Sequence, residues 1–237
     1  MHKKFHRVSS AAVLVCLALG TGCASKLQPA PVVETNSVSL PAIEKKISGL
    51  RSTDEIVLFD GKNLGGWKPT DFGGHGEIFV TNNEIRVEMG AELSGISWTN
   101  HSVLPKTNYE IELDAMKRDG GDFFCGLTMP VGDSFCTFIV GGWGGAVVGI
   151  SSLDGADASE NETTKSFYFE KDRWFHLRVR VTPEKILAWI DGEKIVDVAI
   201  AGKKISMRRG EIEISAPLGL ATWQTSASYK NIRLKNF

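Results

Sequence analysis

The sequence predicts an all-β domain, a jelly-roll β-sandwich, over residues 54–237 of the 237-residue chain. Apolar and polar residues alternate with a period of two through most segments, as they do in half-buried strands. Twenty-two of the 25 glycines fall in this region, which suits many tight turns. No window of a dozen residues has a convincing helical period. Many short antiparallel strands in one unit of this size favour two packed sheets.

Individual elements follow from local patterns. The clearest alternating segments are 83–89, 109–115 and 175–181, and each predicts a strand with one apolar face. Asp191-Gly192 lies between two apolar runs, which predicts a two-residue hairpin because both turn positions need a positive φ. Residues 130–133 mark a second hairpin turn. The remaining strands are predicted at 211–215, 218–222 and 227–235.

The composition excludes several protein classes. Hydrophobic residues make up 42% of the chain and charged residues 23%, which is the balance of a folded globular protein and too apolar for a disordered one. No apolar run reaches the length of about 18 residues that an internal membrane span needs. Residues 54–237 hold 20 Lys and Arg against 26 Asp and Glu, a formal charge of −6. An acidic domain suits a neutral sugar or a cation and disfavours nucleic acid.

The N-terminus has the pattern of a targeting segment. Three basic residues, an apolar run over 11–19 and the small residues 20–22 precede Cys23. This arrangement resembles a bacterial lipoprotein signal, which implies that Cys23 is lipidated and that the protein is anchored in the cell envelope, in an outer-membrane type of sorting. The acyl chains would be its membrane contact. Plain secretion with a buried Cys23 is the alternative. Residues 23–53, with three prolines, are expected to form a flexible tether.

Three stretches resemble one known family. Residues 57–67, VLFDGKNLGGW, are similar to its opening signature. Residues 173–192 contain its hairpin, with a "W-x-x-L-R-V" strand followed by "W-I-D-G", and residues 229–234, YKNIRL, are similar to its closing motif. The family is the 3-keto-disaccharide hydrolase domain. The resemblance implies a concanavalin-A-like jelly-roll fold and chemistry on 3-keto sugars.

That chemistry has simple requirements. A ketone at C3 acidifies the hydrogen at C2, and the glycosidic oxygen on C1 is then β to the carbanion. A general base near C2 and a stabiliser for the enolate oxygen suffice to expel the C1 substituent. Water adds to the product afterwards. The route differs from the two-carboxylate, oxocarbenium mechanism of ordinary glycosidases.

Five polar residues are candidates for this machinery. On the strand predicted at 109–115, Glu112 and Asp114 share the face opposite the apolar residues. The family resemblance implies that this face lines the concave groove, and a merely solvated sheet face is the alternative. Asp122 replaces the asparagine of a family turn and adds a carboxylate. Arg118 is a candidate cationic donor for substrate, and His101 is a further candidate base.

Aromatic residues supply the candidate sugar contacts. Trp143 is flanked by four glycines, which suits an exposed indole that stacks on a sugar ring, although a core position is equally compatible. Trp223 stands where many family members carry histidine, and this departure argues against catalysis. Trp223 and Gln224 remain candidates for binding sugar. The other tryptophans of the signatures are expected in the core, namely Trp67, Trp174 and Trp189.

The acidic loop at 154–162 raises the question of a metal. Four carboxylates lie within nine residues there, and clustered oxygens suit Ca²⁺. Asp154 and Asp157 are the candidate ligands for a divalent ion, Ca²⁺ or Mn²⁺, and an acidic loop without metal is the alternative. Cys125 and Cys136 are expected on the two strands of the hairpin that turns at 130–133. They predict either a cross-strand disulfide or two buried thiols.

Three functions are compatible with these patterns. The first is a surface-anchored hydrolase or lyase of 3-keto glycosides, supported by the family resemblance. The second is a lectin-like carbohydrate-binding module without turnover, supported by Trp143 and Trp223. The third is a structural envelope protein, which no specific residue favours. The predicted site requires Glu112, Asp114, Trp143 and Trp223 to converge on one groove, and scatter over separate faces would make this site assignment wrong even in a member of the family.

Overall fold

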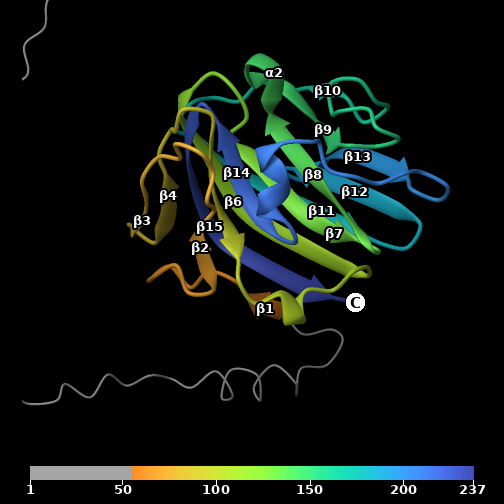
Figure 1. Cartoon of the computed structure of the whole chain (residues 1–237), viewed down its shortest axis with the longest axis horizontal. Coiled ribbons are helices and arrows are strands. Elements are labelled where there is room, and N and C mark those ends of the chain that lie inside the picture. Colours follow the sequence, from red (N-terminus) through yellow and green to blue (C-terminus); the bar gives the residue numbers. More distant parts are fainter. Residues whose placement is uncertain (1–54) are drawn as a thin grey trace, which may run out of the picture. The chain divides into compact units, whose positions relative to one another are not determined.

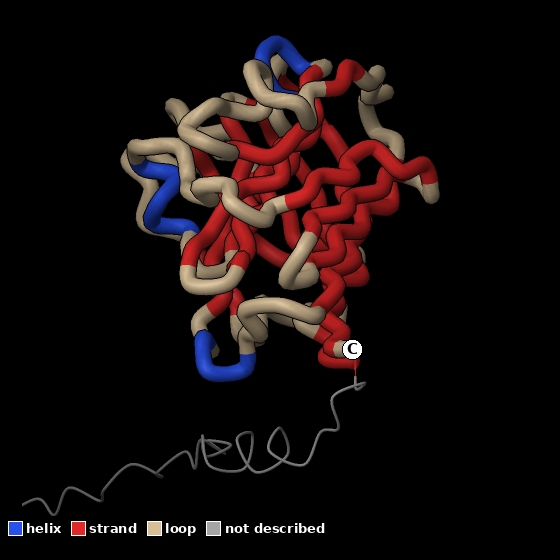
Figure 2. The backbone as a smooth tube through the Cα atoms, turned by 90° about the vertical axis from the view of Figure 1, so that its right-hand side faces the viewer, coloured by secondary structure: helices blue, strands red, loops and turns tan. Residues whose placement is uncertain are grey.

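The computed structural model describes residues 55–237, which form two antiparallel sheets packed as a sandwich. Strands make up most of this part of the chain, and helix is confined to short peripheral segments (Figure 1, Figure 2). The predicted all-β jelly-roll sandwich is therefore confirmed. None of the helices in residues 55–237 is long and apolar enough to cross a membrane. The predicted signal (1–22), lipidation site (Cys23) and tether (23–53) lie outside the described residues.

Each sheet has a simple strand order. Sheet A runs β13 (Glu193–Ala199), β12 (Lys185–Ile190), β11 (Trp174–Val181), β6 (Tyr109–Gly120), β15 (Thr225–Asn236), β4 (Glu84–Val87) and β3 (Ile78–Thr81), with β1 (Glu55–Val57) beside β15. Sheet B runs β10 (Lys165–Ser166), β9 (Val147–Ser151), β8 (Ser134–Gly141), β7 (Cys125–Val131), β14 (Gly219–Trp223), β5 (Leu93–Trp98) and β2 (Trp67–Pro69).

Both predicted hairpins are present. Asp191 and Gly192, with φ of 50° and 83°, turn β12 into β13, as the Asp-Gly signal requires. β7 and β8 form the second hairpin. In its register Cys125 faces Val140 and Cys136 faces Met129, so the two cysteines are not opposite one another. Of the two predicted alternatives, the cross-strand disulfide is therefore wrong and the pair of buried free thiols is confirmed.

The core lies between the sheets and is built by the inward halves of the alternating strands. On β6, Ile111 and Leu113 are fully buried, as the period of two predicts. Two tyrosines of sheet A fix its position against sheet B through their hydroxyls. Tyr109 donates to the carbonyl of Pro130 at 2.5 Å, and Tyr229 donates to the carbonyl of Phe124 at 2.6 Å. Buried phenols need such partners, because an unsatisfied hydroxyl costs free energy.

Three helical segments interrupt the strands, and one corrects a prediction. They are η1 (His101–Val103), α2 (Gly142–Gly145) and η2 (Glu211–Ser215). The alternation in residues 211–215 predicted a strand, but η2 is a 3₁₀ helix in which Ile212 and Ser215 are the buried residues. A spacing of three suits this helix, whose side chains eclipse at i and i+3. Ile212 packs on the outward face of sheet B with Phe72, Leu93 and Ala221.

Two tryptophans expected in the core lie elsewhere. Trp67 is buried, but Trp174 and Trp189 are only half-buried. Trp189 packs under the guanidinium of Arg178 at 4.0 Å, and Trp174 under the ammonium of Lys230 at 4.0 Å. These cation–π contacts place both rings on the outward face of sheet A, which makes the core prediction for them wrong.

Candidate functional site

A cavity of about 430 Å³ lies on the outward face of sheet B. Its floor combines apolar side chains and two hydroxyls, from Leu93, Phe123, Thr137, Ile139, Ser151 and Ile212. Charged residues line it as well, namely Glu92, Asp122, Arg208, Arg209 and Glu211. Trp143, Gly210 and Trp223 complete the lining. A cavity of this size with apolar walls and a few polar groups is typical of a small-ligand site.

Asp122 is the carboxylate most firmly held in this cavity. Its Oδ1 accepts the backbone N–H of Phe123 at 2.8 Å, and its Oδ2 accepts the backbone N–H of Gly144 at 3.0 Å. Its own backbone N–H donates to the Thr225 hydroxyl at 3.1 Å. A carboxylate has about four lone-pair sites, so two remain for a ligand. The side chain is therefore fixed in position and still able to accept a proton.

The tryptophan of α2 takes an unusual backbone conformation. Trp143 has φ 47° and ψ 60°, between Gly141 and Gly144, which also have positive φ. A bulky residue in the left-handed region costs about 1–3 kcal/mol and persists where surrounding contacts hold it. The bond from Gly144 to Asp122 is one such contact. The indole is 42% exposed at the cavity, which confirms the predicted exposed Trp143 and not the core alternative.

Arg208 brings a cation to the same cavity. Its guanidinium carbon lies 5.9 Å from the centre of the Trp143 ring, within cation–π range. Its Nη1 forms an ion pair with Asp157 Oδ2. Asp157 Oδ1 also accepts the hydroxyls of Ser151 at 2.9 Å and Ser152 at 3.0 Å. The Asp157 carboxylate thus fixes the position of the Arg208 guanidinium at the cavity.

Trp223 ends β14 at the edge of the cavity. Its backbone N–H donates to the carbonyl of Phe123 at 3.0 Å, and its half-buried ring packs against the apolar cluster under η2. Gln224 follows it but points away, because its side-chain amide donates to the carbonyl of Ala91 at 3.2 Å. Gln224 does not line the cavity. Of the residues predicted for the site, the cavity therefore brings together Asp122, Trp143 and Trp223.

The predicted bases on β6 lie on the other sheet. Glu112 and Asp114 project from the outward face of sheet A, since Ile111 and Leu113 fill the core side. Asp114 accepts from His176 Nδ1 at 2.9 Å and from the Asn231 amide at 2.6 Å. The expectation that Glu112 and Asp114 share a groove with the two tryptophans is therefore wrong. Period-two alternation identified their face of the strand but not the sheet that carries the cavity.

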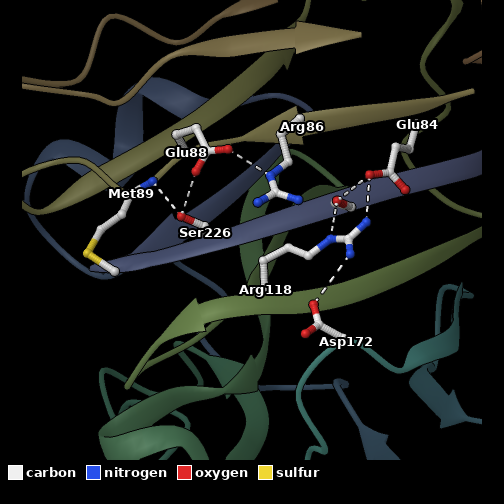
Figure 3. Close-up of polar contacts among 8 residues, drawn as sticks. Glu84, Arg86, Glu88, Met89, Arg118, Asp172 and Ser226 are labelled. Carbon is white, nitrogen blue, oxygen red and sulfur yellow. Dashed lines mark hydrogen bonds and ion pairs between the residues drawn. The ribbon is translucent and has the colours of Figure 1, made fainter. Parts of the chain in front are cut away.

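Arg118 lies on sheet A as well, in a polar network that Figure 3 shows. It donates to Glu84 at 2.7 Å, to the Ser228 hydroxyl at 3.0 Å and to Asp172 at 3.3 Å. Glu84 is buried, so Arg118 compensates a carboxylate that has lost most of its water. The predicted contact of Arg118 with substrate is not supported by this position, because all its nitrogens serve the network.

His101 is exposed and lies at the opposite end of β5 from the cavity. The β5–β14 ladder runs from Leu93 opposite Trp223, at the cavity, to Ser97 opposite Gly219. His101 follows this second end, in η1. It therefore cannot reach a sugar bound beside Trp143 and Trp223, and its predicted role as base has no geometric support.

The carboxylates of the acidic loop at 154–162 accept from donors elsewhere in the protein. Asp154 accepts the backbone N–H of Lys204 at 2.7 Å and lies 3.5 Å from the ammonium of Lys203. Asp157 holds Arg208, as described above. Within residues 55–237 no group of three or more His, Cys, Asp or Glu side chains is placed to hold a metal ion. The residues present do not fit the divalent ion predicted at Asp154 and Asp157.

Several cavity residues were not predicted from the sequence. Arg208 and Arg209 come from the segment that leads into η2, Glu211 is the first residue of η2, and Glu92 precedes β5. The only sequence signal was two adjacent arginines before Gly210, whose φ is 127°. An irregular segment has no periodicity that would indicate which side chains face a sheet.

A family model described as the 3-keto-alpha-glucoside-1,2-lyase-like domain matches residues 54–235. The chain belongs to this family. The family is named for lyase chemistry on 3-keto-α-glucosides, so this is a carbohydrate-active domain family. The signatures at 57–67 and 229–234 lie within the matched residues. No curated protein matches the sequence.

Several solved structures are similar to this chain at low sequence identity. The ligand-free Crh5 transglycosylase is 11% identical, with 78% of this chain and 84% of that chain covered and a TM-score of 0.51. The carbohydrate-binding module CBM66 from Bacillus subtilis is 15% identical over 72% of this chain and 96% of that chain, with a TM-score of 0.49. Domain 4 of AbnA, an arabinanase from Geobacillus stearothermophilus, is 12% identical over 72% and 82%, with a TM-score of 0.48.

Proposed function

We propose that the domain acts on 3-keto glycosides bound in the cavity on sheet B. The observation that carries this proposal is that Asp122, Arg208, Trp143 and Trp223 line one cavity in a chain of the 3-keto-alpha-glucoside-1,2-lyase-like family. The reaction is abstraction of the C2 proton, elimination of the C1 substituent, and hydration of the product.

Asp122 is the residue proposed as the base. It is less exposed than Glu92 and Glu211, which also line the cavity. Glu211 accepts the backbone N–H of Gly73 at 3.2 Å and is otherwise in solvent. The two backbone bonds to Asp122 hold its oxygens in fixed directions, and fixed geometry is what a general base needs. The proton leaves C2, and its electron pair moves into the enolate of the C3 ketone.

Arg208 is the group proposed to stabilise the enolate oxygen. Its guanidinium is cationic, presents planar N–H donors and is oriented by Asp157. Collapse of the enolate breaks the bond from C1 to the glycosidic oxygen, and the departing alkoxide takes up a proton. Water then adds across the new C1–C2 double bond. Trp143 and Trp223 are proposed to stack on the sugar rings, whose C–H groups meet the indole faces.

A non-catalytic sugar-binding module is the second proposed function. It is favoured by Trp223, which replaces the histidine that the family resemblance places there. In this version the same cavity and the same tryptophans bind a glycan, and Asp122 accepts hydrogen bonds from its hydroxyls.

The test is incubation of the purified chain with methyl 3-keto-α-glucoside, with measurement of released methanol. We expect release by the wild-type chain and a loss of about 100-fold or more with Asp122→Asn, because a positioned base contributes about 10²–10⁴-fold. Asp114→Asn, on the other sheet, is the matched control and should keep activity within about twofold. No release by the wild-type chain, together with saturable glycan binding, would select the binding module.

A further inference from the structure

Two hydroxyls lie side by side on the cavity floor. Thr137 of β8 and Ser151 of β9 are directly paired in the β8–β9 ladder, and both line the cavity. Each residue is only 2% exposed, so the hydrogen-bond partners of each hydroxyl are set by the protein. Directly paired residues of an antiparallel ladder have Cβ atoms about 4.5–5.5 Å apart. The two hydroxyls therefore belong to neighbouring residues of one cavity floor whose other side chains are apolar.

The direction of the Thr137 hydrogen bond follows from the chain of groups behind it. Thr137 Oγ1 lies 3.1 Å from Thr128 Oγ1, which lies 2.7 Å from Ser215 Oγ. Ser215 Oγ lies 2.6 Å from the carbonyl oxygen of Ile212. A carbonyl only accepts, so Ser215 donates to it. With three hydroxyl protons for three contacts, Thr128 then donates to Ser215 and Thr137 donates to Thr128.

The Ser151 proton is committed in the same way. Ser151 donates to Asp157 Oδ1 at 2.9 Å, and an ionised carboxylate can only accept. Asp157 also accepts the hydroxyl of Ser152 at 3.0 Å and pairs with the guanidinium of Arg208, so both of its oxygens serve as acceptors. Both floor hydroxyls have thus given their single proton to an acceptor inside the protein. What they present to the cavity is lone pairs.

We propose that Thr137 and Ser151 form an acceptor pair that selects ligands by the hydroxyl donors of a sugar. This inference rests on the proposed sugar-binding function of the cavity and deepens it. A ring hydroxyl can donate to the pair, whereas a ketone oxygen would face two acceptors and be repelled. The pair therefore orients a 3-keto sugar with its carbonyl away from the floor, toward the cationic Arg208. Thr137 and Ser151 are specificity-determining residues and not catalytic ones.

The experiment measures equilibrium binding, by calorimetry, of methyl α-glucoside and its singly deoxygenated and singly fluorinated analogues. None of these carries the ketone that elimination needs, so binding is separated from turnover. We expect the deoxy and the fluoro analogue at one or two ring positions to bind the wild-type chain about five- to tenfold more weakly than the parent, since a net hydrogen bond has about this worth. Fluorine fails to rescue because it cannot donate. Thr137→Val or Ser151→Ala should remove the penalty at the same position.

The variants are chosen to keep the fold. In Thr137→Val, Thr128 still donates to Ser215, so no buried donor is orphaned. In Ser151→Ala, Asp157 keeps Ser152 and Arg208. Thr70→Val is the matched control, because Thr70 forms an equally buried hydroxyl pair with Ser97, at 2.7 Å, outside the cavity. It should show the wild-type penalties.

Three results would overturn the acceptor pair. One is equal penalties in the wild-type chain and in both floor variants. Another is a fluoro analogue that binds as well as the parent at the sensitive position, since the floor would then be donating. The third is the absence of saturable binding of the parent glucoside. Failure of the proposed reaction is read separately, from methanol release with the 3-keto substrate.

Discussion

The two outward faces of the sandwich carry the same kinds of residues and use them differently. Both present carboxylates, arginines and tryptophans. On sheet A many of these groups pair with side chains of neighbouring strands, as Asp114 does with His176 and Asn231. On sheet B the corresponding groups surround a cavity and are held from behind, as Arg208 is by Asp157. Side chains whose hydrogen bonds and ion pairs are all formed within the protein stabilise the fold. Side chains that are held in place but keep free donors or acceptors can bind a ligand.

The backbone contributes to this difference. Strands β6 and β11 of sheet A pair in an uninterrupted ladder from Tyr109 to Met116, so their polar side chains meet cross-strand neighbours at fixed spacing. The cavity on sheet B is bordered by α2 and by the segment before η2, where the ladder has ended. Backbone outside the strands supplies free N–H groups: Gly144 of α2 and Phe123 of the loop between β6 and β7 both donate to Asp122. Functional groups are commonly carried on such segments over a rigid scaffold.

The largest expected effects come from replacing one arginine on each face with methionine. Arg118→Met leaves the buried Glu84 without its cation, and we expect it to lower the free energy of unfolding by about 2–3 kcal/mol, because an uncompensated buried charge is costly. Turnover of the 3-keto substrate should not change. Arg208→Met should lower turnover by about 100-fold or more, as loss of an oxyanion stabiliser does. Its stability should fall by no more than about 1 kcal/mol, because Arg208 is exposed.

Urea unfolding and methanol release, measured on both variants, check that one replacement lowers stability and the other lowers turnover. The comparison breaks if Arg118→Met abolishes turnover in a chain that unfolds at the wild-type urea concentration. It also breaks if Arg208→Met unfolds the domain, because Arg208 would then belong to the scaffold.

A tryptophan from each face gives the next effect in size. Trp143→Gly should weaken binding of methyl α-glucoside about tenfold, since stacking on an aromatic ring contributes about 0.5–1.5 kcal/mol. Its unfolding free energy should stay within about 1 kcal/mol of the wild-type value, because glycine relieves the left-handed strain at φ 47° while adding chain entropy. Trp189→Ala should leave affinity unchanged and lower stability through its lost contact with Arg178. Equal affinity losses in both variants would contradict the division of roles.

The fold was predictable because its signals are local. Alternation placed Ile111 and Leu113 in the core, and the Asp191-Gly192 turn has the conformation that its residues favour. The same alternation misled at 211–215, where Ile212 and Ser215 pack at a spacing of three instead of two. A period in five residues cannot separate a strand from a 3₁₀ turn, because tertiary packing decides between them.

The site was predictable only in part, since it depends on which segments meet in space. The glycines around Trp143 did indicate an exposed indole, and the turn before Asp122 did supply a carboxylate. The alternation of polar and apolar residues indicated Glu112 equally well, but Glu112 lies on sheet A and the cavity lies on sheet B. No sequence pattern indicated Arg208, and its ion-pair partner Asp157 was predicted to be a metal ligand. Pairings between residues about 50 positions apart, such as this one, are set by topology and not by local sequence.

The smallest expected effect concerns the acidic loop behind the cavity. Lys203 lies 2.5 Å from Glu162, and this contact lowers the pKa of the Glu162 carboxyl and raises the pKa of the Lys203 ammonium. Both side chains reach solvent, so water screens the pair and its contribution to stability is small. We expect Glu162→Gln to lower the melting temperature by about 1–2 °C at pH 7.

The pH dependence and the response to metal separate this ion pair from a calcium site. Because the pKa of Glu162 is lower in the folded chain, its contribution is complete above the usual value of about 4.3 and is lost as pH falls through the folded pKa. On the alkaline side the contribution is lost as pH rises through the raised pKa of Lys203. Wild type and Glu162→Gln should therefore melt alike in strong acid, and calcium or EDTA should leave the wild-type melting temperature unchanged. A rise with calcium that disappears in Glu162→Gln would show that the loop binds the ion and that Lys203 is displaced by it.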